Sequence, residues 1–152
     1  MYEILLILHS WLRWVVLGLG LYAIYANYAG WQAQRSFTAS DKKINTMFIG
    51  TLHLQLVIGL ILYGISPMMQ SIMADFGGSM KVKELRFWSV EHMTGMIIGI
   101  LIAQIGSIKS KKASSDTSKF RIACVYFGIG LLIILLMIPF GIWNPERPLF
   151  RV

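Results

Sequence analysis

Residues 122–145 read IACVYFGIGLLIILLMIPFGIWNP, a run of 24 positions without Asp, Glu, Lys or Arg. About 20 apolar residues in a helix cross the roughly 30 Å hydrocarbon core of a bilayer, so this run is long enough to span a membrane. Similar runs without these charges cover residues 14–34, 44–74 and 92–108. The last of these reaches span length when it is extended back to Phe87, which places Glu91 in or beside the membrane. The sequence therefore predicts four transmembrane helices.

The overall composition supports a membrane protein. Charged residues make up 14% of the chain and hydrophobic residues 56%, whereas a soluble domain carries about a quarter charged residues. The net charge is +7, but the basic residues lie at helix ends and in short loops, with no basic face bearing interleaved aromatics. This pattern is typical of topology signals and not of nucleic-acid binding, so lipid is the expected partner and nucleic acid is not. Cys124 is the only cysteine, which excludes a disulfide framework and a thiolate metal cluster.

The chain is expected to form one domain, residues 1–152, with an all-α fold: an up-down bundle of four transmembrane helices. The expected spans are Glu3–Tyr28, Lys43–Ile65, Leu85–Ile108 and Phe120–Trp143. The longest connection contains an apolar, methionine-rich stretch, Met68–Phe76. We expect this stretch to form a short amphipathic outer segment along the membrane surface.

The distribution of Lys and Arg predicts the orientation. The first and third connections, taken with Lys43 and Arg121 at the starts of the next spans, hold eight of these residues, while the second connection, taken with Arg86, and the C-terminal tail hold five. The positive-inside rule then places the first and third loops in the cytoplasm and both termini outside. The opening residues Met1–Glu3 lack a basic n-region and a small-residue cleavage site, so we expect a retained span and not a signal peptide.

Five charged or histidine side chains fall inside the expected spans beyond the first two residues of each: His9, Arg13, His53, Glu91 and His92. Such groups are costly in a bilayer and by default mark function. At 1.5 Å per residue, His9 and His92 lie roughly 9 and 10 Å from the outer side, and an up-down bundle makes their helices diagonal neighbours. A bis-histidine haem needs two imidazoles that approach the iron from opposite faces at a common height. His9 and His92 are therefore the best candidate ligand pair.

Other residues near this pair fit the same interpretation. Arg13 lies one turn below His9, and Arg86 precedes His92 near the outer interface. Either arginine could pair with a haem propionate through charge-assisted hydrogen bonds. Alternatively, Arg13 and Glu91 could form an ion pair that holds the first and third spans together.

Small residues beside the histidines allow a close approach. On the third span they are Gly95, Gly99, Ala103 and Gly106, and on the second span Gly50 and Gly64 share a face with His53. Such stripes leave room for either a flat macrocycle or the backbone of a neighbouring helix, and the sequence is compatible with both.

His53 is the least explained of the histidines, because the diagonal fourth span offers it no histidine partner. It could replace one haem ligand, hydrogen-bond a quinone or donate to a propionate, and the sequence does not choose. Gln55 and Tyr63 on the same span could line a quinone pocket or serve as ordinary packing residues.

Several stretches carry a family resemblance: residues 8–14 (LHSWLRW), residues 53–56 (HLQL) with Gly59 and Tyr63, residues 86–92 (RFWSVEH) and residues 109–112 (KSKK). Over nearly the whole chain they resemble a family of small four-helix bacterial membrane proteins labelled cytochrome b-like. The resemblance implies a haem b protein of the bacterial inner membrane. The chain is also similar in size to one half of the haem A synthase architecture, another four-helix bundle with histidine ligands, although the ligand spacing differs.

Three hypotheses follow. The first is a cytochrome with at least one haem b that exchanges electrons with quinone or a redox protein partner, with His9 and His92 as axial ligands. In that case His53, Arg13 and Glu91 would be the polar side chains around the haem ligands. The second is a copper or zinc site without haem, formed by the three histidines and Glu91. The third is a non-catalytic subunit of a larger complex, and a homo-oligomer is compatible with all three. The chain has no nucleophile elbow, phosphate loop or workably spaced carboxylate pair, so hydrolase chemistry is not expected.

Overall fold

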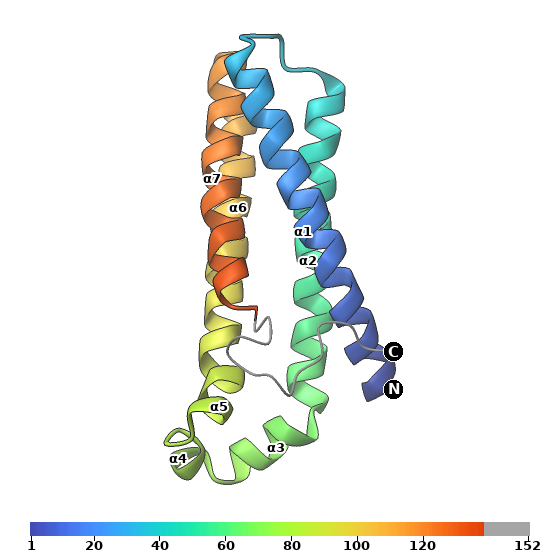
Figure 1. Cartoon of the computed structure of the whole chain (residues 1–152), viewed down its shortest axis with the longest axis vertical. Coiled ribbons are helices and arrows are strands. Elements are labelled where there is room, and N and C mark those ends of the chain that lie inside the picture. The colour runs from blue at the N-terminus through green and yellow to red at the C-terminus, as the bar shows by residue number, and fades with distance from the viewer. Residues whose placement is uncertain (139–152) are drawn as a thin grey trace.

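Four long helices run alternately up and down and form one bundle (Figure 1). The computed structural model describes residues 1–138, and within this range it contains no strands. The long helices are α1 (Tyr2–Gln32), α2 (Ala39–Ile65), α6 (His92–Lys112) and α7 (Asp116–Leu136). All four are long and apolar enough to cross a membrane when α6 is counted together with the helical turns that precede it. The predicted all-α four-helix membrane fold is confirmed.

The connection between α2 and α6 is also largely helical. It contains α3 (Pro67–Ala74), α4 (Phe76–Ser79), α5 (Lys83–Arg86) and a π-helical turn, η1 (Phe87–Glu91). The α5 and η1 turns continue directly into α6, so the third span is one helical run over Lys83–Lys112. The stretch predicted to form a short outer helix is helical in α3, which buries Met69 and Ile72 and leaves Met73 exposed.

Several helix ends differ from the prediction, and local chemistry explains them. α2 begins at Ala39 because Thr38 and Asp41 form a capping box, in which the Thr38 N–H donates to Asp41 Oδ2 at 2.9 Å. α7 ends at Leu136, not at Trp143. The chain continues with Pro139, and a proline disfavours helical geometry in the residue before it. Residues 139–143 of the expected fourth span lie outside the described residues.

The helices pack in a ring of neighbours. α1 packs on α2 and α7, α7 packs most extensively on α6, and α2 approaches α6 more loosely. α1 and α6 are therefore diagonal in the bundle, as the up-down topology predicted. The half of the bundle toward the first connection contains buried aromatic rings. There Phe48 and Phe127 are fully buried and meet across the bundle, with 5.2 Å between their ring centroids.

The small residues of α6 serve helix packing. A β-carbon added at Gly99 would lie 2.9 Å from the carbonyl oxygen of Gly130 on α7, and one added at Gly106 would collide with the Tyr126 side chain. The stripe therefore lets the α6 and α7 backbones come together, which is one of the two roles considered for it. On α2, by contrast, Gly50 and Gly64 have open space around their α-carbons.

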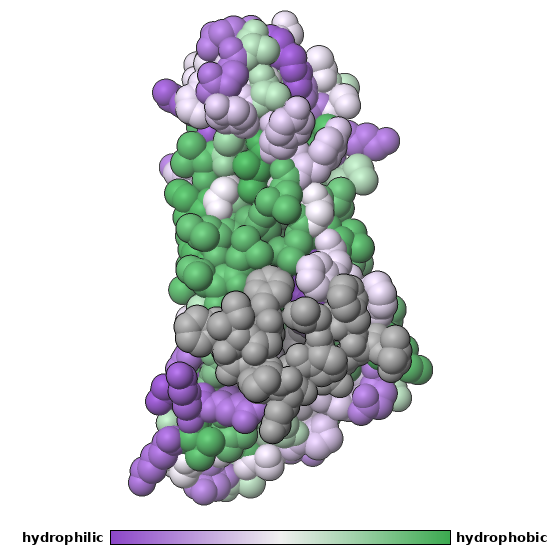
Figure 2. All heavy atoms as spheres, viewed as in Figure 1, coloured by the Kyte–Doolittle hydropathy of each residue, from purple (hydrophilic) through white to green (hydrophobic). Residues whose placement is uncertain are grey.

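The surface matches the hydrophobic interior of a bilayer. Figure 2 shows a broad hydrophobic band around the middle of the visible face, with hydrophilic residues gathered at both ends. Large apolar side chains such as Leu21 and Leu132 are 61% and 57% exposed on this surface. Because these side chains would be unfavourable in water, the chain is a multi-pass membrane protein.

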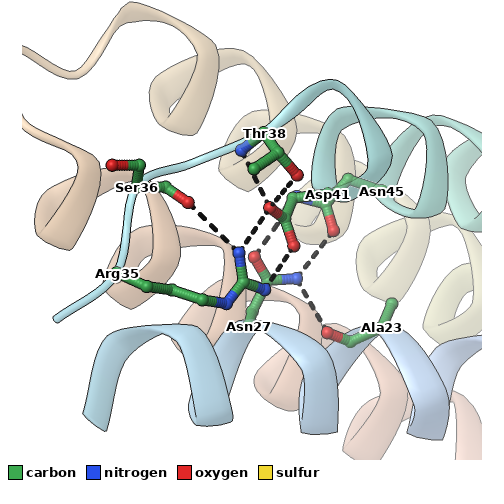
Figure 3. Close-up of polar contacts among 7 residues, drawn as sticks. All are labelled: Ala23, Asn27, Arg35, Ser36, Thr38, Asp41 and Asn45. Atoms are coloured by element: carbon green, nitrogen blue, oxygen red, sulfur yellow. Dashed lines mark hydrogen bonds and ion pairs between the residues drawn. The ribbon is translucent and has the colours of Figure 1, made fainter. Parts of the chain in front are cut away.

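A polar network ties the first connection to the helix ends (Figure 3). The guanidinium of Arg35 donates to both carboxylate oxygens of Asp41 at 2.7 and 2.6 Å. This hydrogen bonding raises the pKa of Arg35. One layer further into the bundle, Asn27 Nδ2 donates to Asn45 Oδ1 at 2.6 Å and to the Ala23 carbonyl at 2.7 Å. Both asparagines are buried, so α1 and α2 are joined by a satisfied polar pair.

Candidate functional site

A cavity of about 210 Å³ lies between α1, α2 and α6, in the half of the bundle that holds the N-terminus. The polar side chains that matter for its chemistry are His9, Arg13, Gln55, Tyr63, Trp88 and His92. Most of the remaining wall consists of aliphatic and methionine side chains. A mainly apolar cavity with a few convergent polar groups is the usual form of a cofactor site.

His9 enters the cavity from α1 and packs against α2. A β-carbon at Gly59 would lie only 3.1 Å from Cε1 of the His9 ring, so the glycine makes room for the imidazole. Gln55 Nε2 donates to the backbone carbonyl of His9 at 3.0 Å and ties the two helices at this level. The Nδ1 atom of His9 is buried and has no hydrogen-bond partner among the described residues. The site therefore contains a buried ring nitrogen that makes no hydrogen bond to the described residues.

His92 enters from α6, and its ring is held from α7. Its Nδ1 lies 2.9 Å from the carbonyl oxygen of Met137. A carbonyl only accepts hydrogen bonds, so Nδ1 carries the proton and Nε2 keeps its lone pair. A β-carbon at Gly95 would collide with the Met137 side chain, so Gly95 lets this end of α7 come close. A ligating histidine is commonly oriented in this way, with its second N–H bonded to a backbone carbonyl.

The structure brings His9, His92 and Arg13 together. All three line the same cavity, and the two imidazoles are close enough to interact electrostatically with each other and with Arg13. Arg13 also donates to Ser10 at 3.4 Å, and its guanidinium lies 5.4 Å from the centroid of the Trp14 ring. The two best candidate ligands therefore share one cavity with a cation.

The other candidate residues lie elsewhere. His53 is exposed on the outer surface of α2 and does not line the cavity. Arg86 Nε and Glu91 Oε1 form an ion pair at 2.8 Å, with side chains that are 44% and 42% exposed, and neither lines the cavity. The carboxylate of Glu91 therefore forms its ion pair with Arg86, which belongs to the same helical run as Glu91. Of the two arginines considered for a propionate, only Arg13 reaches the cavity.

Within residues 1–138, no three or more His, Cys, Asp or Glu side chains gather closely enough to hold a metal ion. The three histidines and Glu91, which the copper or zinc hypothesis requires around one ion, do not form such a group. What the cavity does contain is a pair of histidines from diagonal helices.

Two parts of the site were not predicted. One is the η1 turn directly before His92, where the Ser89 carbonyl accepts a hydrogen bond from Tyr63 Oη at 3.0 Å. π-Helical turns often occur at functional sites. The other is Trp88, whose ring centroid lies 5.3 Å from that of His92. The spacing of four residues between Trp88 and His92 is a signal that could have predicted this contact.

Comparisons of the chain with protein-family models, with curated proteins and with solved structures found no match. A functional interpretation therefore depends on the geometry of the cavity and on the chemistry of its side chains.

Proposed function

We propose that this chain is a membrane cytochrome that holds one haem b between His9 and His92 and transfers electrons. The observation that carries the proposal is the pair of imidazoles on diagonal helices in one apolar cavity. Bound haem supplies one-electron redox chemistry at its iron. The resemblance of the sequence to the cytochrome b-like family supports the same assignment.

The number of available ligands favours haem over a bare metal ion. Zinc usually requires three or four protein ligands, and the described residues contain no cluster of three. A porphyrin would supply most of the ligands of its iron itself, so the protein would need to provide only two side chains to hold it. His9 and His92 match that requirement.

The surrounding residues have distinct roles in this proposal. The Met137 carbonyl orients His92 and leaves its Nε2 as the ligand atom. The His9 ring, which no other described side chain holds by a hydrogen bond, is positioned by packing against Gly59. Arg13 supplies a positive charge that suits a propionate. The aliphatic wall excludes water, and burial of this kind helps to set the reduction potential.

The electron partner would be a membrane quinone or a redox protein at the bacterial inner membrane. A quinone is favoured by one feature of the cavity. The Gln55 side-chain oxygen is buried without a hydrogen-bond partner among the described residues, although Gln55 Nε2 is bonded to His9. An acceptor of this kind suits the hydroxyl group of a quinol. Tyr63 lines the same cavity.

The test uses the three histidines as an internal comparison. We expect the purified full-length protein to contain haem with a Soret absorbance and about one haem per chain. His9→Ala and His92→Ala should each lose most of the haem, because each removes one of the two side chains that would hold it. His53→Ala is the matched control, since His53 is exposed outside the cavity, and it should retain full haem content.

The measurements are the pyridine haemochrome content and the spectra of the oxidised and reduced protein. A protein without haem that tolerates all three substitutions would overturn the proposal and favour the accessory-subunit hypothesis. Equal haem loss in all three variants would also contradict it, because the cavity would then not explain the binding.

A further inference from the structure

A second cavity, of about 240 Å³, lies at the opposite end of the bundle from the histidine cavity. Its lining includes one lysine from each of three helices: Lys42 of α2, Lys111 of α6 and Lys119 of α7. No acidic side chain of the described residues lines it. Three cations from separate helices therefore surround one space close to the first and third connections.

Serine side chains also line the cavity. Ser107 lines the cavity and is only 2% exposed. The neighbouring Ser110 hydroxyl donates to the Lys119 carbonyl at 2.8 Å. A serine hydroxyl that lines a cavity can donate a hydrogen bond to a group inside it. Ser107 is therefore placed to donate to a group that enters the cavity.

The charges around this cavity are largely uncompensated. Lys119 forms an ion pair with Asp116 at 2.8 Å, but Lys42 and Lys111 have no ion-pair partner in residues 1–138. The two connections at this end, residues 33–43 and 109–121, contain eight basic and only two acidic residues. One of those acidic residues is Asp116, and the other, Asp41, is paired with Arg35.

We propose that this cavity binds a phosphate group, supplied either by the headgroup of an anionic phospholipid or by free phosphate. Phosphate carries negative charge that the lysines attract, and it has several oxygens that accept hydrogen bonds from ammonium groups and from the Ser107 hydroxyl. The lysines of the cavity lie near the ends of long apolar helices, which is the level of lipid phosphates in a bilayer. Basic pockets between transmembrane helices commonly bind such headgroups.

The experiment compares two double variants of equal charge in the full-length protein. Lys42→Gln with Lys111→Gln removes two lysines that line the cavity, whereas Lys43→Gln with Lys112→Gln removes the adjacent exposed lysines that do not. Bound lipid is measured by native mass spectrometry after addition of phosphatidylglycerol, with phosphatidylcholine as the uncharged comparison. A second series measures thermal unfolding with inorganic phosphate, with chloride at equal ionic strength as its comparison.

We expect the unsubstituted protein to retain phosphatidylglycerol but not phosphatidylcholine. The cavity variant should bind it at least roughly tenfold more weakly, while the control should change by less than about twofold. Ser107→Ala, which conserves the packing and the charge, should also weaken binding. Stabilisation by inorganic phosphate, lost in the same variants, would identify free phosphate as the ligand.

Two results would overturn the proposal. Equal weakening in both double variants would show general attraction of lipid to a basic surface and no specific cavity. Failure of phosphatidylglycerol and of inorganic phosphate to bind or stabilise the unsubstituted protein would exclude a phosphate site. Neither result depends on haem binding, so the outcome is independent of the proposed cytochrome function.

Discussion

The Nδ1 atom of His92 lies 2.9 Å from the backbone carbonyl oxygen of Met137, the residue that caps the C-terminal end of α7. Carbonyls at the end of a helix have no partner within the helix, so this bond satisfies one of them. The same bond fixes which ring nitrogen carries the proton. His92 therefore has a structural role and, in the proposed cytochrome, a ligand role that uses the opposite nitrogen.

The two roles of His92 can be separated by substitution. His92→Asn provides an amide N–H near the position of Nδ1 but has no atom equivalent to Nε2, whereas His92→Leu removes both. We expect both variants to lose haem. The Asn variant of the haem-free protein should be more stable than the Leu variant by about 1 kcal/mol, because it retains a hydrogen bond to Met137. Haem content and thermal unfolding measure the two effects, and full haem content in the Asn variant would contradict the ligand role.

Gly59 should control how His9 sits in the cavity. An alanine β-carbon at this position would lie 3.1 Å from Cε1 of His9, so the ring would have to move. We expect Gly59→Ala to weaken haem affinity about tenfold, since overpacking typically costs about 1–3 kcal/mol. Gly50→Ala is the control, because Gly50 lies on the same helix with open space around it. A haem titration that gives the same affinity for both variants would argue against contact between α2 and the ligand.

The π-helical turn before His92 can be removed by deletion of one residue. Deleting Val90, which is 39% exposed, should let the turn continue as an α-helix. The deletion would also place Trp88 three residues before His92 instead of four, and Ser89 two residues before it instead of three, which changes their directions relative to His92 by a fraction of a turn. We expect the Trp88–His92 contact and the Tyr63–Ser89 hydrogen bond to be lost, with a shifted haem spectrum in a protein that still folds.

Val90→Ala is the matched control for the deletion. It changes the side chain at the same position without changing the register, so it should leave the spectrum unchanged. If the deletion variant keeps the spectrum of the unsubstituted protein, the η1 turn does not shape the site.

The buried Asn27–Asn45 pair should couple α1 to α2. Asn27→Leu and Asn45→Leu each leave one amide without its partner, so each should destabilise the protein by about 1–3 kcal/mol. The double variant should lose less stability than the sum of the two single losses, with a coupling energy of roughly 0.5–2 kcal/mol. Unfolding in mixed micelles measures this double-mutant cycle. Strictly additive losses would mean that the 2.6 Å hydrogen bond between them contributes nothing to stability.

The number of spans could be predicted because the thickness of a bilayer sets a minimum length for each uncharged run. The helix ends depend on local hydrogen bonds. The start of α2 at Ala39 follows from the capping box of Thr38 and Asp41, a spacing visible in the sequence but not used in the prediction. The end of α7 before Pro139 could have been predicted from the proline.

Depth along each helix could also be predicted, but direction around each helix could not. Counting residues placed His9 and His92 at one level, and both line one cavity. His53 was placed only by depth, and it points outward from α2. In a membrane protein the lipid-facing and inward-facing sides of a helix are both apolar, so hydrophobic periodicity does not identify the inner face. The π-helical turn was missed because its residues have no composition that distinguishes them from an α-helix.

The histidine cavity occupies only the half of the bundle that holds the N-terminus, while the buried rings of Phe48 and Phe127 lie in the other half. A single redox centre in that half would have a short route to one membrane face and a long, aromatic-packed route to the other. Electrons would then enter and leave on the same side, and the chain alone would not conduct charge across the bilayer. In a respiratory assembly it would act as a local relay, and net transfer across the membrane would require a second centre in another subunit.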